Sequence, residues 1–180
     1  LRAKNANAEL RSMLRRDPDV NARANAARAL GAAEDKEAYG LLLDAAVNGD
    51  DQRVRVSAIR SLGSLKDVKA LKPLVEHGNK LIAQAKKTRA ANPSEKTELL
   101  EIAAVVGRLV PNSYDDTAVD FLQALRKLDR YRSGETETAL ATVAPSGYVG
   151  EFNLDNNGYS DWRVADAYAD GLGVIAAGTD

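Results

Sequence analysis

Apolar side chains recur along the chain at spacings of three and four residues, which is the pattern of amphipathic helices that bury one face. Leu10 and Leu14 lie on the first such face, in a helix predicted over 5–16. Asp17 can cap the next helix, and Pro18 suits its first turn, where a missing N–H costs nothing. Later segments repeat the pattern between short polar turns. The chain is therefore predicted to be all-α.

One stretch of this pattern occurs twice. Residues 22–31 return at 54–63, 32 positions later, and both copies close on Leu-Gly. The same offset joins residues beyond each copy, so the repeated unit is a whole helix–turn–helix pair. The matched pairs are Arg23 with Arg55, Ala26 with Ala58, Arg28 with Arg60, Asp35 with Asp67, Ala38 with Ala70 and Leu42 with Leu74. A unit that repeats at this period stacks on its own copy.

Two further copies are looser. The segment 98–107 again ends in glycine, and 115–122 matches 67–74 at an offset of 48. The segment 161–173 ends in Leu-Gly, as the best copies do. We expect a single array of about three helix pairs with half a pair at each end, within a larger protein. Its predicted segments are 1–16 (second helix of a truncated repeat), 17–48 and 49–92 (repeats), 93–146 (a longer, irregular repeat), 147–160 (a loop) and 161–180 (first helix of a truncated repeat).

The two best copies resemble the HEAT-repeat family, especially its bacterial branch similar to phycobilisome-lyase-type repeats. The residues that carry the resemblance are Val54-Arg55, Ala58 and Leu62-Gly63 in the first helix and Asp67, Ala70-Leu71 and Pro73-Leu74 in the second. The resemblance implies a right-handed α-solenoid, HEAT/armadillo-like, of antiparallel helix pairs that usually serves as a scaffold for protein contacts. The segments 98–126, 135–141 and 161–164 resemble arrays in large bacterial proteins, some of which carry a cyclophilin-type peptidyl-prolyl isomerase domain. Nothing here resembles the catalytic β-barrel of that family.

Composition and charge exclude several classes of function. The chain of 180 residues has 25 basic and 26 acidic residues, whereas a protein that holds nucleic acid by its backbone needs a clustered basic surface. Cysteine is absent, which excludes disulfides and thiolate metal sites. No apolar run approaches the ~20 residues of a membrane span. We expect no cofactor, no nucleic-acid partner, no membrane insertion and a monomer joined to further repeats or domains; the compartment, cytoplasmic or periplasmic, stays open.

Two features that could have a catalytic or metal-binding role have structural interpretations that we prefer. The single histidine, His77, has no second histidine or cysteine with which to share a metal, so a surface or half-packed position is expected. A calcium loop that begins at Asp155 needs glycine sixth and glutamate twelfth, where Ser160 and Asp166 stand.

Four arginines recur in register and either line an anion-binding surface or bridge neighbouring repeats. We favour bridging, because acidic residues recur beside them. They are Arg23, Arg28, Arg55 and Arg60.

The second helices of the pairs are expected to line the concave face of the array. Their candidate partner-binding residues, which are expected to be exposed, are Lys69, Lys72, Glu76, Lys80, Gln123, Arg126 and Arg130. This mixture of charges suits a protein or peptide partner, and equally a plain solvated face. The leading hypothesis is a non-enzymatic interaction scaffold. The alternatives are a non-catalytic array attached to a prolyl isomerase, a lyase-like module that handles a chromophore, and nucleic-acid recognition by a basic helix row.

Overall fold

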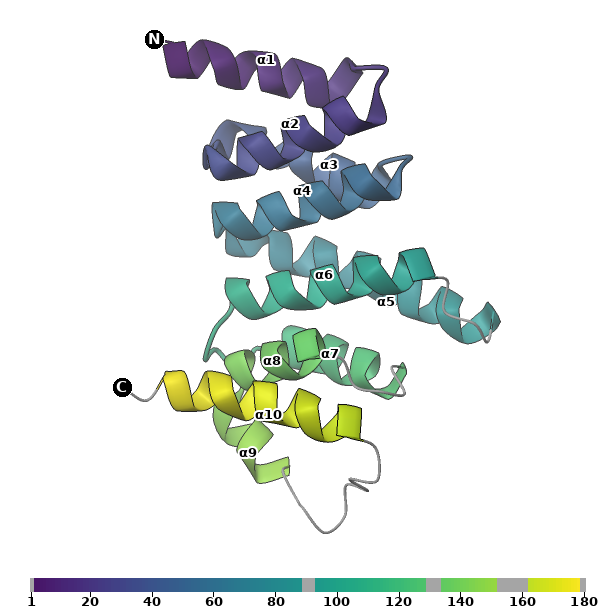
Figure 1. Cartoon of the computed structure of the whole chain (residues 1–180), viewed down its shortest axis with the longest axis vertical. Coiled ribbons are helices and arrows are strands. Elements are labelled where there is room, and N and C mark those ends of the chain that lie inside the picture. Colours follow the sequence, from purple (N-terminus) through teal and green to yellow (C-terminus); the bar gives the residue numbers. More distant parts are fainter. Residues whose placement is uncertain (1, 89–92, 129–133, 152–161, 179–180) are drawn as a thin grey trace. The chain divides into compact units, whose positions relative to one another are not determined.

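The computed structural model describes residues 2–88, 93–128, 134–151 and 162–178, which form α-helices and two short 3₁₀ helices and contain no strand (Figure 1). The all-α prediction is therefore confirmed. The chain divides into two compact units. Unit 1 is Leu1–His77 and unit 2 is Gly78–Asp180.

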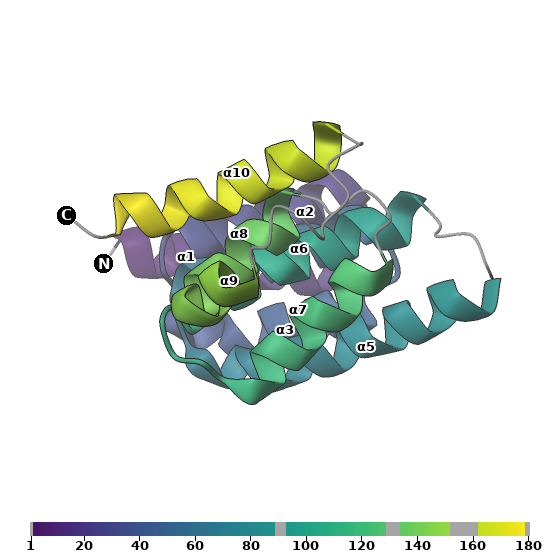
Figure 2. The ribbon, with the colours of Figure 1, turned by 90° about the horizontal axis from the view of Figure 1, so that it is seen from below.

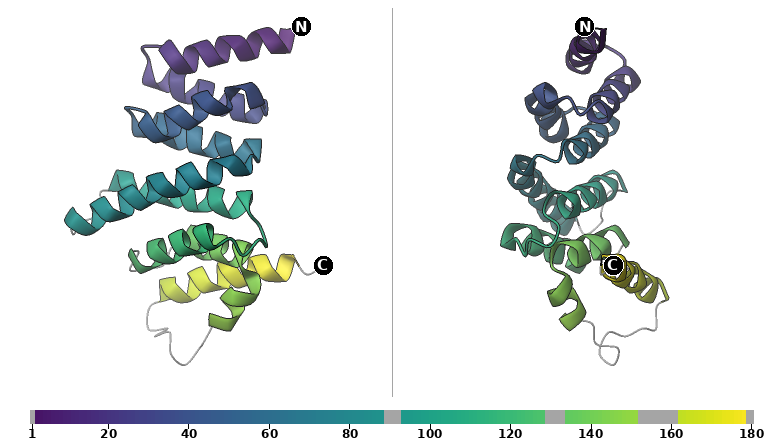
Figure 3. Two further views of the ribbon diagram at one scale, coloured as in Figure 1. Left: turned by 180° about the vertical axis from the view of Figure 1, so that it is seen from behind. Right: turned by 90° about the vertical axis from the view of Figure 1, so that its left-hand side faces the viewer.

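Unit 1 has two layers of helices. The helix α1 (Arg2–Arg16) is followed by the pair α2 (Val20–Ala32) and α3 (Tyr39–Asn48) and then by α4 (Gln52–Leu65) and α5 (Leu71–Thr88). The helix α5 continues into unit 2. The first helices α2 and α4 pack along each other, and the second helix α3 packs on α4 from the other layer (Figure 3). The 3₁₀ helices η1 (Lys36–Ala38) and η2 (Val68–Ala70) precede α3 and α5.

Aspartates set the boundaries of these elements. Each accepts a hydrogen bond from a backbone N–H two or three residues later, and so satisfies an amide that the first turn of a helix leaves without a partner. The bonds join Asp19 to Asn21 (2.7 Å) and Ala22 (2.9 Å), Asp35 to Glu37 (3.2 Å), Asp51 to Arg53 (2.8 Å) and Asp67 to Lys69 (3.0 Å). The recurring aspartates of the sequence are therefore the starts of the repeated helices.

The recurring glycine lets the first helices approach closely. A Cβ built on Gly31 of α2 would lie 2.5 Å from the Ser61 Oγ and 2.8 Å from the Ser61 Cα of α4. The hydroxyl of Ser61 donates across the same contact to the carbonyl of Ala27, at 2.8 Å. Fully buried apolar side chains fill the space around this contact and between the layers. They include Leu30, Leu42, Ile59 and Leu62.

Unit 2 arranges three of its described helices in one row. The helix α8 (Gly134–Val143) lies between α6 (Pro93–Leu109) and α10 (Trp162–Ala177) and packs on both (Figure 2). The helices α7 (Asp116–Leu128) and α9 (Pro145–Glu151) pack against α8 as second helices. A Cβ on Gly107 of α6 would lie 3.0 Å from the Ala139 Cα of α8, which repeats the contact between Gly31 and Ser61.

This row changes the predicted organisation after α7. The sequence predicts one irregular repeat over 93–146 and a loop over 147–160, whereas α8 and α9 form a short pair of their own. The loop prediction is wrong over 147–151, and 152–160 lie outside the described residues. The pair escapes the repeat pattern because Ala141 follows Leu140 where glycine is expected and because α9 has only seven residues. The single array over 1–180 and its right-handed turn stay predictions.

Candidate functional site

The predicted partner-binding residues of α5 are exposed. Lys72, Glu76 and Lys80 are spaced by four residues and therefore share one face of the helix. Lys69 is exposed on η2. The role of these four residues in binding stays a prediction.

Arg126 of α7 has surroundings that differ from the prediction. Its side chain is 9% exposed, and its Nε and Nη2 each donate at 2.8 Å to the carboxylate of Glu137 on α8, which has no exposed side-chain surface. Its guanidinium also lies 5.8 Å from the centre of the Tyr148 ring. The prediction that Arg126 is exposed is wrong, because a buried carboxylate requires a cation beside it. Gln123 is half-buried, and Arg130 lies outside the described residues.

The bridging interpretation of the recurring arginines is confirmed for Arg23. Its guanidinium donates to the carbonyl of Asp17 at 2.9 Å and to both carboxylate oxygens of Asp50, in the next repeat, at 3.0 and 3.2 Å. The equivalent Arg55 donates to the carbonyl of Gly49 at 2.9 Å. Such charge-assisted bonds hold the turns of successive repeats in register.

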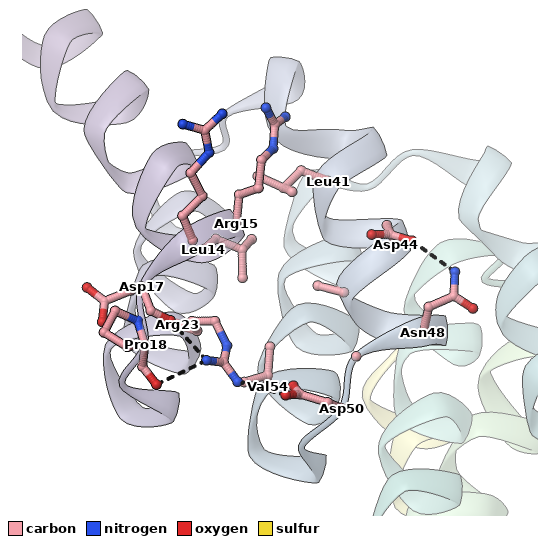
Figure 4. A pocket seen from close by; sticks show the side chains of 13 residues that line it. Leu14, Arg15, Asp17, Pro18, Arg23, Leu41, Asp44, Asn48, Asp50 and Val54 are labelled. Atoms are coloured by element: carbon pink, nitrogen blue, oxygen red, sulfur yellow. Dashed lines mark hydrogen bonds and ion pairs between the residues drawn. The ribbon is translucent and has the colours of Figure 1, made fainter.

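A groove that the sequence analysis did not select opens between α1 and α3, within unit 1 (Figure 4). Its cavity measures about 520 Å³. Buried or half-buried apolar side chains line it, namely Leu14, Leu41, Ala45 and Val54. Polar side chains surround them, namely Arg15, Arg16, Asp17, Asp44, Asn48 and Asp50. An apolar floor with a few polar groups at its edge is the composition of a binding site.

The aspartate carboxylates of this groove each accept a hydrogen bond from a neighbouring residue. Asp50 holds Arg23, and the Oδ1 of Asp44 accepts from the side-chain amide of Asn48 at 2.9 Å (Figure 4). The Oδ1 of Asp17 accepts from the N–H of Asp19 at 2.9 Å. Each of the three carboxylates therefore already has a bonding partner within unit 1.

Two arginines of the groove are not occupied in this way. Arg15 and Arg16 are both exposed in the last turn of α1. Neither guanidinium makes a hydrogen bond or an ion pair with any residue that the structure describes. Among the charged side chains that line the groove, these two arginines are therefore the ones without a hydrogen-bond or ion-pair partner in the described residues.

The repeat offset is a sequence signal that leads to this groove. Moving 32 residues back from Glu76 and Lys80, which belong to the predicted set, gives Asp44 and Asn48 on α3. Another step back from Asn48 gives Arg16 on α1. The prediction selected the residues on α5 and omitted the equivalent residues on α3 and α1.

The pKa of Asp51, which begins α4 beside the groove, is lowered from its ordinary value of 3.8, chiefly by the hydrogen bond from the Arg53 side chain. A lowered pKa in the folded state stabilises the fold above pH 3.8, and this contribution is lost as the pH falls through the folded-state value. In Arg53→Ala the pKa of Asp51 is expected to rise toward 3.8. Carbon-13 NMR titration of the carboxyl groups measures this change. The exposed Arg60→Ala serves as the control, and an unchanged Asp51 pKa in Arg53→Ala would contradict the assignment.

Neither a metal site nor a membrane-spanning helix is found in the described ranges. No group of three or more His, Cys, Asp or Glu side chains in the described ranges could hold a metal ion. No helix in those ranges has the length and apolar character needed to cross a membrane. His77 is half-buried on α5, as expected, and does not line the groove. The proposed calcium loop from Asp155 begins outside the described residues.

Comparison with known families identifies the repeat. The family model of HEAT repeats matches residues 7–86, a segment that reaches from α1 into α5. This part of the chain belongs to the HEAT-repeat family. The groove between α1 and α3 lies within these HEAT repeats, as do Arg15 and Arg16. No curated protein matches the chain in sequence.

Proposed function

We propose that this chain is a non-enzymatic interaction scaffold that binds a peptide segment of a partner protein on the second helices of its HEAT repeats. HEAT repeats commonly act as protein-interaction scaffolds. The observation that carries the proposal is the groove between α1 and α3, with its cavity of about 520 Å³. Its apolar floor offers an anchor point for a side chain, and its polar edge offers partners for a peptide backbone.

The chemistry of the groove supports binding rather than catalysis. The residues that line it include no serine, threonine, tyrosine or histidine. Nucleophilic catalysis needs such a group within reach of a base. The three carboxylates of the groove are Asp17, Asp44 and Asp50, and each is bonded to a neighbouring group. Attachment to an isomerase domain and a role in handling a chromophore gain no support from these residues.

Selection from a library of random displayed peptides tests the proposal. Enriched peptides are expected to bind the wild-type chain and to lose at least about tenfold in affinity, or ~1.4 kcal/mol, in Ala45→Arg. The substitution places a long side chain on the floor of the groove. Fluorescence anisotropy of the labelled peptides measures the affinity.

The matched control is Ala32→Arg, which makes the same chemical change at an exposed position of α2. It is expected to bind the peptides as the wild type does. Failure to enrich any peptide, or equal binding to Ala45→Arg and Ala32→Arg, would contradict the proposed function.

A further inference from the structure

We propose that the groove between α1 and α3 selects an acidic segment of its partner, whose Asp or Glu carboxylates pair with Arg15 and Arg16. This inference rests on the proposed function and names the chemistry of the peptide. The segment also carries an apolar residue, which the floor formed by Leu14 and Leu41 accepts.

The partners available within the groove favour an acidic ligand. Its carboxylates already have partners, whereas Arg15 and Arg16 have none among the described residues. A guanidinium presents a planar fork of donors that matches a carboxylate. A partner that brings carboxylates to this rim therefore gains ion pairs without displacing a bond that the fold already makes.

Arg23 differs from Arg15 and Arg16 in having partners within the fold. Arg23 lines the same groove, but its guanidinium is 15% exposed and is held by Asp50 and by the carbonyl of Asp17. Arg23 therefore has a structural role in joining neighbouring repeats. Arg15 and Arg16 line the groove from the last turn of α1, and both are exposed.

The surrounding acids favour a peptide over a nucleic acid. A polynucleotide brings a closely spaced row of phosphates and needs a continuous basic surface. Three acidic side chains surround the two arginines within one groove, namely Asp17, Asp44 and Asp50. A row of phosphates that follows the groove would meet these carboxylates, whereas one or two peptide carboxylates can reach the arginines alone.

An NMR titration tests the inference. The nitrogen-15-labelled chain is titrated with acetyl-Gly-Leu-Asp-Glu-Leu-Gly-amide and with its neutral twin, in which Asn and Gln replace the two acids. The acidic peptide is expected to shift amide signals in the last turn of α1 and along α3, and to bind at least about tenfold more tightly than the twin. Its affinity falls as salt is added.

Charge removal at the arginines gives the decisive comparison. The double variant Arg15→Gln, Arg16→Gln is expected to bind the acidic peptide no better than the neutral twin. The double variant Arg28→Gln, Arg60→Gln is the matched control, because both arginines are exposed on the first helices and neither lines the groove. It is expected to bind as the wild type does. Circular dichroism verifies that both variants fold, and Arg15→Lys, Arg16→Lys, which keeps the charge and loses the fork, is expected to bind with intermediate affinity.

The outcomes separate this inference from the proposed function. Equal binding of the acidic and neutral peptides, or full binding by Arg15→Gln, Arg16→Gln, overturns the acidic selection and leaves peptide binding in place. Amide shifts at the arginines with oligothymidylate and none with the acidic peptide overturn it in favour of a nucleic acid. No response to any of these probes also overturns it, and the library selection then decides separately on the proposed function.

Discussion

Glu137→Ala is expected to destabilise unit 2 severely, with a loss of about 3–5 kcal/mol in the free energy of unfolding. The substitution leaves the guanidinium of Arg126, 9% exposed, without the carboxylate that holds it by two hydrogen bonds of 2.8 Å. Breaking one side of a buried pair costs more than the pair contributes, because the remaining charge stays desolvated. Urea denaturation followed by circular dichroism measures the loss.

Apolar side chains are expected to replace the buried pair of Arg126 and Glu137, because position 137 is an apolar position in an equivalent helix. It lies four residues before Ala141, as Ile59 lies four residues before Gly63 in α4, and both side chains are fully buried. An apolar residue therefore suits this place in a first helix. The double variant Arg126→Met, Glu137→Leu is expected to recover most of the stability that Glu137→Ala loses.

A more exposed ion pair provides the control for this experiment. Arg108 and Glu101 approach to 3.9 Å, and their side chains are 56% and 13% exposed. Arg108→Ala is expected to change the free energy of unfolding by less than about 1 kcal/mol. A loss in Glu137→Ala no larger than that in Arg108→Ala would contradict the assigned role of the buried pair.

Gly31→Ala is expected to lower the free energy of unfolding of unit 1 by about 1–3 kcal/mol. The added Cβ would lie 2.5 Å from the Oγ and 2.8 Å from the Cα of Ser61, so the backbones of α2 and α4 must separate. In Gly40→Ala, on α3, the new Cβ meets nothing within 4 Å. That variant is expected to gain up to about 1 kcal/mol, because alanine is the better helix former.

The two alanine substitutions are chemically identical, so the sign of their difference is the test. Thermal and urea denaturation of both variants measure it. Adding Ser61→Gly to Gly31→Ala removes the side-chain part of the clash and leaves the contact with the Cα, so only partial recovery is expected. Equal effects of Gly31→Ala and Gly40→Ala would show that the approach of α2 and α4 does not depend on the glycine.

Much of the fold follows from local sequence, because the repeated positions carry their own physical causes. The aspartates Asp19 and Asp51 start first helices by accepting amide hydrogen bonds, and the repeated Leu-Gly marks a close helix contact. The pair α8–α9 escapes the pattern because Leu140-Ala141 stands where Leu-Gly is expected, so the sequence pattern passes over it. Ala139 nevertheless faces Gly107 as Ser61 faces Gly31, so the close helix contact is kept.

The candidate site was less accessible to sequence reasoning, because exposure depends on tertiary partners. The sequence pattern places Arg126 among the polar residues of its helix, but its side chain pairs with Glu137 on the next helix and is buried there. The groove depends on the separation of α1 and α3, which no local pattern specifies. The charges of Arg15 and Arg16 are visible in the sequence, whereas the absence of a partner among the described residues required the structure.

The claim that the second helices carry the binding surface is tested most directly by a map of the bound peptide. Amide signals of the nitrogen-15-labelled chain are followed as a peptide from the library selection is added. The expected shifts lie in 14–18 at the end of α1 and in 41–50 along α3 and its following turn, two segments that contain most of the residues lining the groove. Shifts confined to the exposed faces of α2 and α4 would contradict the claim.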